Sequence, residues 1–172
     1  MHPWWRMDGA MRAYLETPRP RPGYRPCVGI VLLDRLNQVF VGQRVDTVLD
    51  AWQMPQGGID QGETPVAAAL REMREEIGTD RARLLAESRV WRSYDLPRDL
   101  ARQMWGGRFR GQTQRWLAFR FEGRDEDIRI DLPPPEFRAW RWVEPDRLID
   151  LIVPFKRDVY VSVVDEFRRL WA

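Results

Sequence analysis

The stretch from Gly57 to Thr79 constrains this 172-residue chain more than any other feature. It reads GGIDQGETPVAAALREMREEIGT and joins a glycine-rich turn to a segment with helix signals at both ends. Thr64 can accept an amide hydrogen bond at a helix start, and Pro65 suits the first helical position because its missing N–H has no intrahelical partner there. Gly78 favours the left-handed conformation that ends many helices. The sequence therefore predicts a helix that begins at Pro65 and stops at Gly78.

The predicted helix has two different faces. At about 100° per residue, one stripe collects its apolar side chains: Val66, Leu70, Met73 and Ile77. Glu72, Glu75 and Glu76 cluster on another side, so we expect one face to pack and the other to present carboxylates. Three carboxylates within two turns repel one another and meet the negative end of the helix dipole. A hard divalent cation bound to them explains the cluster, and a solvated acidic face relieved by Arg71 and Arg74 is the alternative.

The fixed positions of the stretch favour the metal interpretation, because together they resemble the Nudix box. That pattern is a glycine, five residues, a glutamate, seven residues and a final helical block. This chain matches it at Gly57, Glu63, Arg71, Glu72, Met73, Glu75, Glu76 and Gly78. Only Thr79 departs from the pattern, at a packing position where an aliphatic residue is usual. So many fixed residues at fixed spacing make the resemblance specific.

Composition indicates one globular domain and excludes several kinds of chemistry. With 44% hydrophobic and 31% charged residues, the chain is long enough for a sizeable core. The net charge is only +2 and Lys156 is the sole lysine, so we expect no general basic surface and no DNA partner. The single cysteine, Cys27, rules out an intramolecular disulfide. The single histidine is His2, near the N-terminus, so acid-base chemistry falls to carboxylates.

The N-terminal residues predict an extension in front of the domain. Residues 1–23 read as partly helical or flexible, with a helical piece up to Thr17 and then an extended Pro/Arg linker. Trp4 and Trp5 are candidates to pack onto the domain, which we expect over residues 24–172. No apolar run approaches the roughly 20 residues of a membrane span, and the start lacks a secretory signal. We therefore expect a cytoplasmic protein without a membrane partner; the sequence indicates no particular protein partner.

The remaining segments predict an α/β (α+β) fold. The apolar run over 27–33 indicates a buried strand that turns back into an antiparallel partner over 38–44. Three more segments rich in aromatic and β-branched residues read as strands: 89–94, 114–121 and 139–143. Trp140 and Trp142 alternate, so they should share one face. Strands, a helix, more strands and a terminal helix suit a mixed sheet between helices.

The predicted terminal helix, from Pro154 through Leu170, has a cation on its apolar side. Its apolar stripe comprises Val159, Val163, Phe167 and Leu170. Lys156 falls on the same side in the first turn, where an inward cation is unfavourable unless an anion lies nearby. Lys156 therefore either faces substrate phosphate at the rim of a site or runs along the core edge with its ammonium in water. Spacing alone leaves both interpretations open.

The resemblance extends far beyond the box, from Gly23 to Trp171. The segments that carry it are GYRPCVGIVLL, WQMPQGG, GQTQRWLAFRF, PEFRAWRWV and VPFKRDVY. Together they resemble the RNA 5′-pyrophosphohydrolase branch of the Nudix hydrolases, whose relatives include dinucleoside polyphosphate hydrolases. The resemblance implies a Nudix α/β/α sandwich and an enzyme that acts on phosphoric anhydride bonds. It also implies several Mg²⁺ or Mn²⁺ ions per active site.

The resemblance implies a role for each matching position. The metals are held by Gly57, through its carbonyl, and by Glu72, Glu75 and Glu76. The catalytic carboxylates are Glu72 or Glu76, one of which relays the water's proton, and Glu136, which approaches the metals from outside the box. Substrate contacts fall to Arg25, Arg44, Tyr94, Phe155 and Lys156, with Arg44 on phosphate and Tyr94 the weakest match. Glu63, Arg71 and Gly78 are implied to be structural.

The implied function is removal of pyrophosphate from 5′-triphosphorylated RNA ends, by water that attacks a phosphorus of the polyphosphate. Hydrolysis of dinucleoside polyphosphates of the Ap4A type is the alternative. A non-catalytic nucleotide-sensing module is the alternative of a different class, although such sensors usually lack a box carboxylate and none is missing here.

Two charged segments fit plainer interpretations. Four arginines either guide RNA or belong to an exposed Gly-Gly loop: Arg98, Arg102, Arg108 and Arg110. The acidic run Asp125–Asp127 with Asp131 reads as a solvated turn, since it lacks a calcium-loop pattern.

Overall fold

A computed structural model describes residues 7–172 of the chain. Its α-helices are α1 (Gly9–Leu15), α2 (Pro65–Ile77), α3 (Arg98–Trp105), α4 (Leu148–Leu151) and α5 (Arg157–Phe167). Its strands are β1 (Glu16–Thr17), β2 (Arg25–Leu33), β3 (Val39–Arg44), β4 (Trp52–Gln53), β5 (Gln56–Gly58), β6 (Ala82–Asp95), β7 (Gly111–Phe121) and β8 (Phe137–Val143). Short 3-10 turns occupy Asp125–Asp127, Pro145–Arg147, Pro154–Lys156 and Arg168–Leu170. No helix within residues 7–172 is long and apolar enough to cross a membrane.

The strands form one mixed sheet in the order β1-β6-β7-β2-β3-β4, with β5 beside β2 and β8 beside β3. The central pair, β2 and β7, is parallel, and the other pairs are antiparallel. Because β2 pairs with β3 only near the turn between them, at Leu33 and Val39, the two strands diverge from there. The divergence lets β5 pair with β2 and bring Gly57 opposite Val28. The predicted mixed sheet is confirmed.

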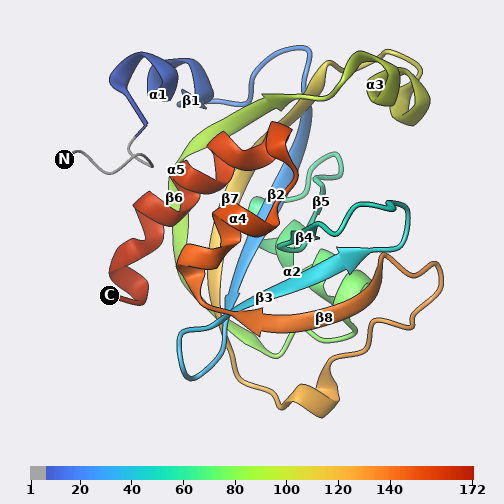
Figure 1. The fold of residues 1–172 in the computed structure, drawn as a ribbon, viewed down its shortest axis with the longest axis vertical. Coiled ribbons are helices and arrows are strands. Elements are labelled where there is room, and N and C mark those ends of the chain that lie inside the picture. Colours follow the sequence, from blue (N-terminus) through green and yellow to red (C-terminus); the bar gives the residue numbers. More distant parts are fainter. Residues whose placement is uncertain (1–6) are drawn as a thin grey trace.

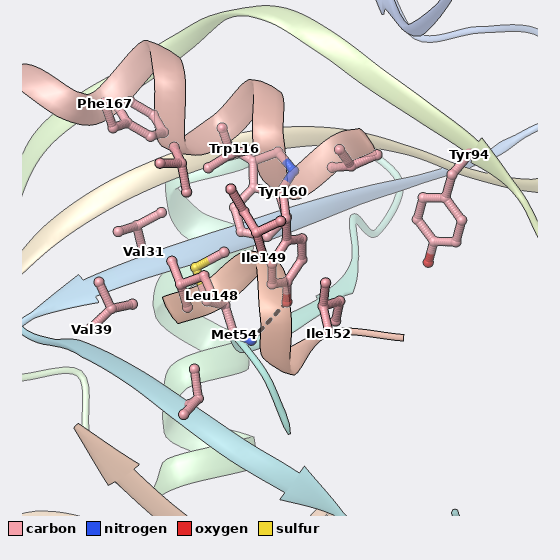
Figure 2. Packing of buried hydrophobic residues seen from close by; sticks show 14 of the residues in the cluster. Val31, Val39, Met54, Tyr94, Trp116, Leu148, Ile149, Ile152, Tyr160 and Phe167 are labelled. Atoms are coloured by element: carbon pink, nitrogen blue, oxygen red, sulfur yellow. Dashed lines mark hydrogen bonds between the residues drawn. The ribbon is translucent and has the colours of Figure 1, made fainter. Parts of the chain in front are cut away.

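Helices cover both faces of the sheet (Figure 1). On one face, α4 and α5 pack over Val31, Trp116 and other side chains of the central strands. On the other, α2 packs over the opposite side chains of the same strands, among them Ile30 and Leu117. Figure 2 shows the first of these cores, where the Met54 N–H donates a hydrogen bond of 2.8 Å to the Tyr160 hydroxyl. A strand with both faces buried reads as a continuous apolar run, which explains the sequence of β2.

The motif helix begins and ends where the sequence predicts. The Thr64 side chain accepts a hydrogen bond from the Ala67 amide, Pro65 is the first helical residue and Gly78 caps the helix with φ of 75°. The expected apolar stripe packs on the sheet, with Met73 and Ile77 fully buried. Each such side chain stabilises the fold by about 1.5–3 kcal/mol.

The carboxylates of α2 lie on a separate face beside the packing stripe, as expected, but the expectation that this face presents all three of them is wrong. Glu72 and Glu76 are buried, and of the three glutamates only Glu75 is exposed. The reason is that Ala68, Glu72 and Glu76 form their own row at intervals of four residues beside the apolar stripe. Gly57 in β5 lies against this row, since a side chain on Gly57 would overlap the Glu72 carboxylate. Strand β5 therefore lies against the carboxylate row of α2, in which Glu72 and Glu76 are buried.

The outer strands and the terminal helix agree with the sequence in position, although β6 is longer than expected. Trp140 and Trp142 of β8 share a face, with ring centroids 5.9 Å apart, as their alternation predicts. The C-terminal helical run begins with the 3-10 turn at Pro154–Lys156 and continues through α5. Residues 98–105, interpreted from the sequence as part of an exposed loop, instead form α3, which ends at the left-handed Gly106.

The N-terminal residues are built into the fold more firmly than their sequence indicates. Helix α1 ends in Leu15, which belongs to the same core as α5, and β1 pairs with β6. The buried Arg92 of β6 holds this junction together: its side chain donates to Ser162 at 2.6 Å and to Glu166 at 2.6 Å, and lies 3.6 Å from Glu16. The predicted packing of Trp4 and Trp5, and the position of His2, lie outside the described residues. The boundary between residues 23 and 24 stays a prediction.

Candidate active site

Two buried carboxylates of α2 form one side of the candidate site. Glu72 and Glu76 are both less than one-tenth exposed. Within the described chain, the Oε2 atom of Glu76 has no hydrogen-bond partner. Burial, to which the charges of Glu72 and Glu136 add, raises the pKa of Glu76 well above its usual range. Burial also raises the pKa of Glu72, although Arg71 opposes the rise. This side of the site therefore carries excess negative charge, and the Oε2 atom of Glu76 has no partner to offset it among the described residues.

The glycine-rich turn is fastened to α2 by Arg71. The Arg71 guanidinium donates two hydrogen bonds of 2.9 Å to Glu63 and one of 2.8 Å to the Gly58 carbonyl. Its remaining nitrogen donates to Glu72 at 2.8 Å and to Glu75 at 3.3 Å. The hydrogen bonds from Arg71 hold the pKa of Glu63 down at about 2. These contacts fix the turn so that Gly57 stands against the Glu72 carboxylate.

The end of β3 brings a cation and a third carboxylate near α2. The Arg44 side chain is held by Asp46, to which its Nε donates at 2.7 Å, and lies 3.9 Å from a carboxylate oxygen of Glu136. Glu136 stands just before β8, and its carbonyl accepts a hydrogen bond from the Val45 amide. The charges of Arg44 and Glu136 act on the Glu76 carboxyl in opposite directions. The structure thus brings these two residues of distant segments to the carboxylates of the box.

Lys156 is enclosed rather than directed to water, which decides between the two interpretations of its spacing. It is 6% exposed, and its ammonium donates a hydrogen bond of 3.2 Å to Gln53 and lies 5.6 Å from the centre of the Tyr94 ring. Burial, aided by the charge of Arg44, lowers the pKa of Lys156 to about 7. Its contact with substrate phosphate stays a prediction.

Aromatic side chains surround Lys156. The Tyr94 and Phe155 rings lie 6.0 Å apart, and Phe155 is 36% exposed. Tyr94 is buried, and its hydroxyl has no hydrogen-bond partner among the described residues. An exposed aromatic ring next to a buried cation is suited to a nucleobase on one side and a phosphate on the other.

Arg25 completes the group of predicted residues from a third direction. Its guanidinium packs against Gly58, where an added side chain would meet an Arg25 nitrogen at 2.5 Å. On its other side, the Trp105 ring of α3 lies 5.9 Å from the guanidinium carbon. Helix α3 therefore helps to position Arg25 beside the glycine-rich turn.

The oxygen donors of the site fit a hard divalent cation, but the carboxylates do not form a metal-binding cluster in this structure. An unpartnered buried oxygen on Glu76 and the raised pKa values of Glu72 and Glu76 indicate negative charge that a cation would relieve. Within residues 7–172, however, no three His, Cys, Asp or Glu side chains lie close enough together to hold a metal ion. Arg71 occupies Glu72 and Glu75 instead. Each of these hydrogen bonds uses one carboxylate oxygen, and metal binding by the same residues stays a prediction.

Sequence reasoning missed three residues that shape the site. Gln53 accepts the hydrogen bond of Lys156, Asp46 holds Arg44, and Trp105 covers Arg25. Only Asp46 left a signal, since it stands two residues after Arg44, where a short-range ion pair is possible. Gln53 and Trp105 reach the site through strand pairing and through α3, which no local pattern reveals.

Comparison with known proteins points to one family. The NUDIX domain family matches residues 23–163. The chain is 51% identical over 164 residues to a protein of Rickettsia conorii named RNA pyrophosphohydrolase, covering 95% of this chain and 99% of the relative. A protein of the same name from Rickettsia africae is 54% identical with the same coverage.

Solved structures share the fold. The E. coli dihydroneopterin triphosphate pyrophosphohydrolase superposes with a TM-score of 0.59 at 20% identity, covering 81% of this chain and 95% of that one. A C. elegans Ap4A hydrolase superposes with a TM-score of 0.58 at 17% identity, covering 83% and 98%. At such identities the likeness shows the α/β/α architecture alone.

Proposed function

Because the chain belongs to the NUDIX domain family and is a hydrolase of phosphoric anhydride bonds, we propose that it removes pyrophosphate from 5′-triphosphorylated RNA ends. The name of its Rickettsia relatives supports this substrate. One observation carries the proposal for the site: the buried Glu76 carboxylate, whose Oε2 has no hydrogen-bond partner in the described chain, lies within electrostatic reach of two cations, Arg44 and Lys156. Such a division of charge suits a polyphosphate, whose oxygens meet the cations while its metals meet the carboxylates.

The reaction consumes one water. The water oxygen bonds to a phosphorus of the bridge between the α and β phosphates, and the bridging P–O bond breaks. Pyrophosphate is released, and the RNA keeps a 5′-monophosphate. Nudix hydrolases in general use divalent metal ions, which offset phosphate charge and make water more acidic; we propose Mg²⁺ or Mn²⁺, several per site, for this chain. The residues implied to hold them are Gly57, Glu72, Glu75 and Glu76.

The chain's own residues supply the proton acceptor and the binding of substrate. Glu76 is the better base candidate of the two, because its Oε2 is free of partners within residues 7–172 while Glu72 is engaged by Arg71. Burial raises the pKa of Glu76, and a carboxylate with a raised pKa is a stronger base. Arg44 and Lys156 contact the phosphates, and Phe155 stacks with the first base. Glu136 tunes Glu76 through its charge.

The test is pyrophosphate release from triphosphorylated RNA with Mg²⁺, with Mn²⁺ and with a chelator. We expect release with the metals, none with the chelator, and strong impairment in Glu76→Gln. The matched control is Glu122→Gln, which removes a carboxylate from an exposed pair with Arg83. The absence of metal-dependent release from every RNA and dinucleoside polyphosphate would overturn the enzyme reading in favour of a nucleotide-sensing module.

Dinucleoside polyphosphates remain the alternative substrate, because they too join a nucleotide to a polyphosphate. Turnover of diadenosine tetraphosphate and of triphosphorylated RNA at equal concentration distinguishes the two. A higher kcat/KM for the dinucleotide would reverse the proposed order.

We propose that the enzyme lies in the cytoplasm, where RNA 5′ ends are processed. Cell fractionation with an antibody to the chain tests this location.

A further inference from the structure

Helix α3 and the Gly-Gly loop after it concentrate positive charge at one edge of the molecule (Figure 1). Residues 98–110 contain four arginines and one acidic residue, whereas the whole chain has a net charge of only +2. Arg98, Arg102 and Arg108 are exposed, and none of the three has an ion pair within residues 7–172. Arg98 and Arg102 also stand four residues apart on α3, where like charges repel. An anionic ligand would relieve this repulsion.

Aromatic rings lie between the guanidinium groups of this edge. The Trp105 and Phe109 rings meet edge to face, with centroids 5.9 Å apart, and both are partly exposed. The guanidinium carbon of Arg25 lies 5.9 Å from the centre of the Trp105 ring, and that of Arg108 lies 5.1 Å from the centre of the Phe109 ring. Arg102 is one turn before Trp105 on the same helix face. We call these five residues the α3 surface.

The backbone of the loop holds the two rings together. The Arg108 amide donates a hydrogen bond of 3.0 Å to the Trp105 carbonyl, and the Arg110 amide donates one of 3.0 Å to the Gly23 carbonyl. Gly106 and Gly107 have φ of 59° and 79°, the left-handed region that favours glycine. The chain therefore turns back after α3, and Phe109 meets the ring of Trp105.

Arg25 connects the α3 surface to the candidate active site. Its guanidinium packs against Gly58, the residue after Gly57, which stands against the Glu72 carboxylate. A strand of RNA whose 5′ phosphates lie at the site can therefore leave it past Arg25 and along α3. The rings favour RNA over an acidic protein as the ligand, because exposed aromatic faces stack on bases and gain no comparable contact from carboxylates.

We propose that the α3 surface binds the single-stranded RNA downstream of its first nucleotides, with phosphates at Arg102 and Arg108 and a base against Phe109. The proposal rests on the proposed function, since it takes the 5′ end of the same strand to be in the site. Dinucleoside polyphosphates have no downstream strand to place on α3. A preference for longer RNA then comes from the α3 surface and not from the motif helix.

The first experiment measures binding of an unstructured RNA with a 5′-monophosphate over a series of salt concentrations, without divalent metal. The slope of log affinity against log salt should become shallower by about 1.4 in Arg102→Gln/Arg108→Gln, because each phosphate contact on a single strand contributes about 0.7. The matched control is Arg35→Gln/Arg169→Gln. It removes the same charge from exposed arginines that likewise have no ion pair within residues 7–172, and it should keep the wild-type slope.

The second experiment tests the aromatic contact and the length preference. Phe109→Ala should weaken binding of the same RNA by about fivefold to a hundredfold, the range for loss of one stacked base, and Phe109→Tyr should preserve it. In hydrolysis assays, the double arginine variant should raise KM for a long triphosphorylated RNA about tenfold at physiological salt. Its kcat, and its turnover of diadenosine tetraphosphate, should equal those of the wild type.

The outcomes separate this inference from the proposed function. An unchanged salt slope in the double arginine variant, or an equal change in the control, overturns RNA binding by the α3 surface and favours an acidic protein as its partner. That result leaves RNA hydrolysis standing. If the wild type hydrolyses no RNA, the proposed function fails, and the salt slopes still decide whether RNA binds along α3.

Discussion

Two groups of buried charges in this molecule differ in how they are balanced. At the junction of β1, β6 and α5, the buried Arg92 has a carboxylate of Glu166 at 2.6 Å and one of Glu16 at 3.6 Å, while its Nη1 has no hydrogen-bond partner among the described residues. On α2, Glu76 is also buried. One of its oxygens has no partner in the described chain, and the charges of two further carboxylates, Glu72 and Glu136, raise its pKa. The first group is balanced by the fold itself. The second has no such ion pair at Glu76 among the described residues.

The difference separates charges that stabilise the fold from charges that destabilise it and serve function. An unpaired buried charge is costly, and folded proteins retain it mainly where a ligand or a reaction requires it. The Arg92 cluster joins the N-terminal segment to α5 and so supports the fold. The Glu76 cluster destabilises the fold, and we propose that divalent cations offset its charge. Exchanging a residue in each group should therefore affect different properties, which the following experiments measure.

The largest effect is expected for Glu76→Gln, which keeps the shape of the side chain and removes its charge. We expect kcat to fall by about 10²–10⁴-fold, the range for loss of a general base. Stability should not fall, because the variant removes an uncompensated buried charge. Phosphate release and urea denaturation measure the two properties. A variant that is less stable than the wild type would contradict the view that Glu76 is unbalanced.

Arg92→Met should have the opposite profile. It leaves Glu16 and Glu166 without their buried partner, so the free energy of unfolding should fall by about 3–5 kcal/mol, as for broken buried pairs. The kcat of the folded fraction should stay within a few-fold of the wild type. Arg83→Met, in an exposed pair with Glu122, is the control and should change stability by less than about 1 kcal/mol. A loss no larger than that of the control would show that the cluster does not hold the junction.

Gly57→Ala tests how closely the turn approaches the carboxylates. An added Cβ would lie 1.9 Å from the carboxyl carbon of Glu72, so that side chain must move. Because a displacement of about 1 Å near the chemistry costs on the order of a hundredfold in rate, we expect kcat/KM to fall by up to that factor. Gly9→Ala is the control, since nothing lies within 4 Å of its added Cβ. Equal activities of the two variants would refute the close approach.

The smallest effect concerns Lys156 and pH. Its pKa is about 7 in the folded protein and 10.5 as a free side chain, so between these values the unfolded chain binds more protons. Stability of the metal-free protein should then rise with pH, by about 1 kcal/mol between pH 7 and pH 8 relative to Lys156→Met. Denaturation at the two pH values measures it. A flat difference between wild type and variant would place the Lys156 ammonium in water.

Much of the fold was predictable because its signals are local. Thr64, Pro65 and Gly78 set the ends of α2 through their own backbone preferences, and the apolar run of β2 indicated a strand buried on both faces. Helix α3 was missed because it has no side-chain cap and spans only eight residues, although Leu100, Ala101, Met104 and Trp105 recur at helical spacing. The docking of α1 was missed because it depends on residues far along the chain, among them the core around Leu15 and Asp165, which pairs with Arg12 at 2.7 Å.

By itself, the sequence determined the order of turn, helix and carboxylates along the chain, through the fixed spacing of the box, and from that order it predicts which residues carry the chemistry. Only the tertiary structure decided their surroundings. Glu76 is buried with one oxygen unpartnered in the described chain, Lys156 lies between Gln53 and Tyr94, and Tyr14 lines a pocket. Burial and charge balance depend on segments that meet only after folding, because the free energy of a charge is set by its neighbours in space.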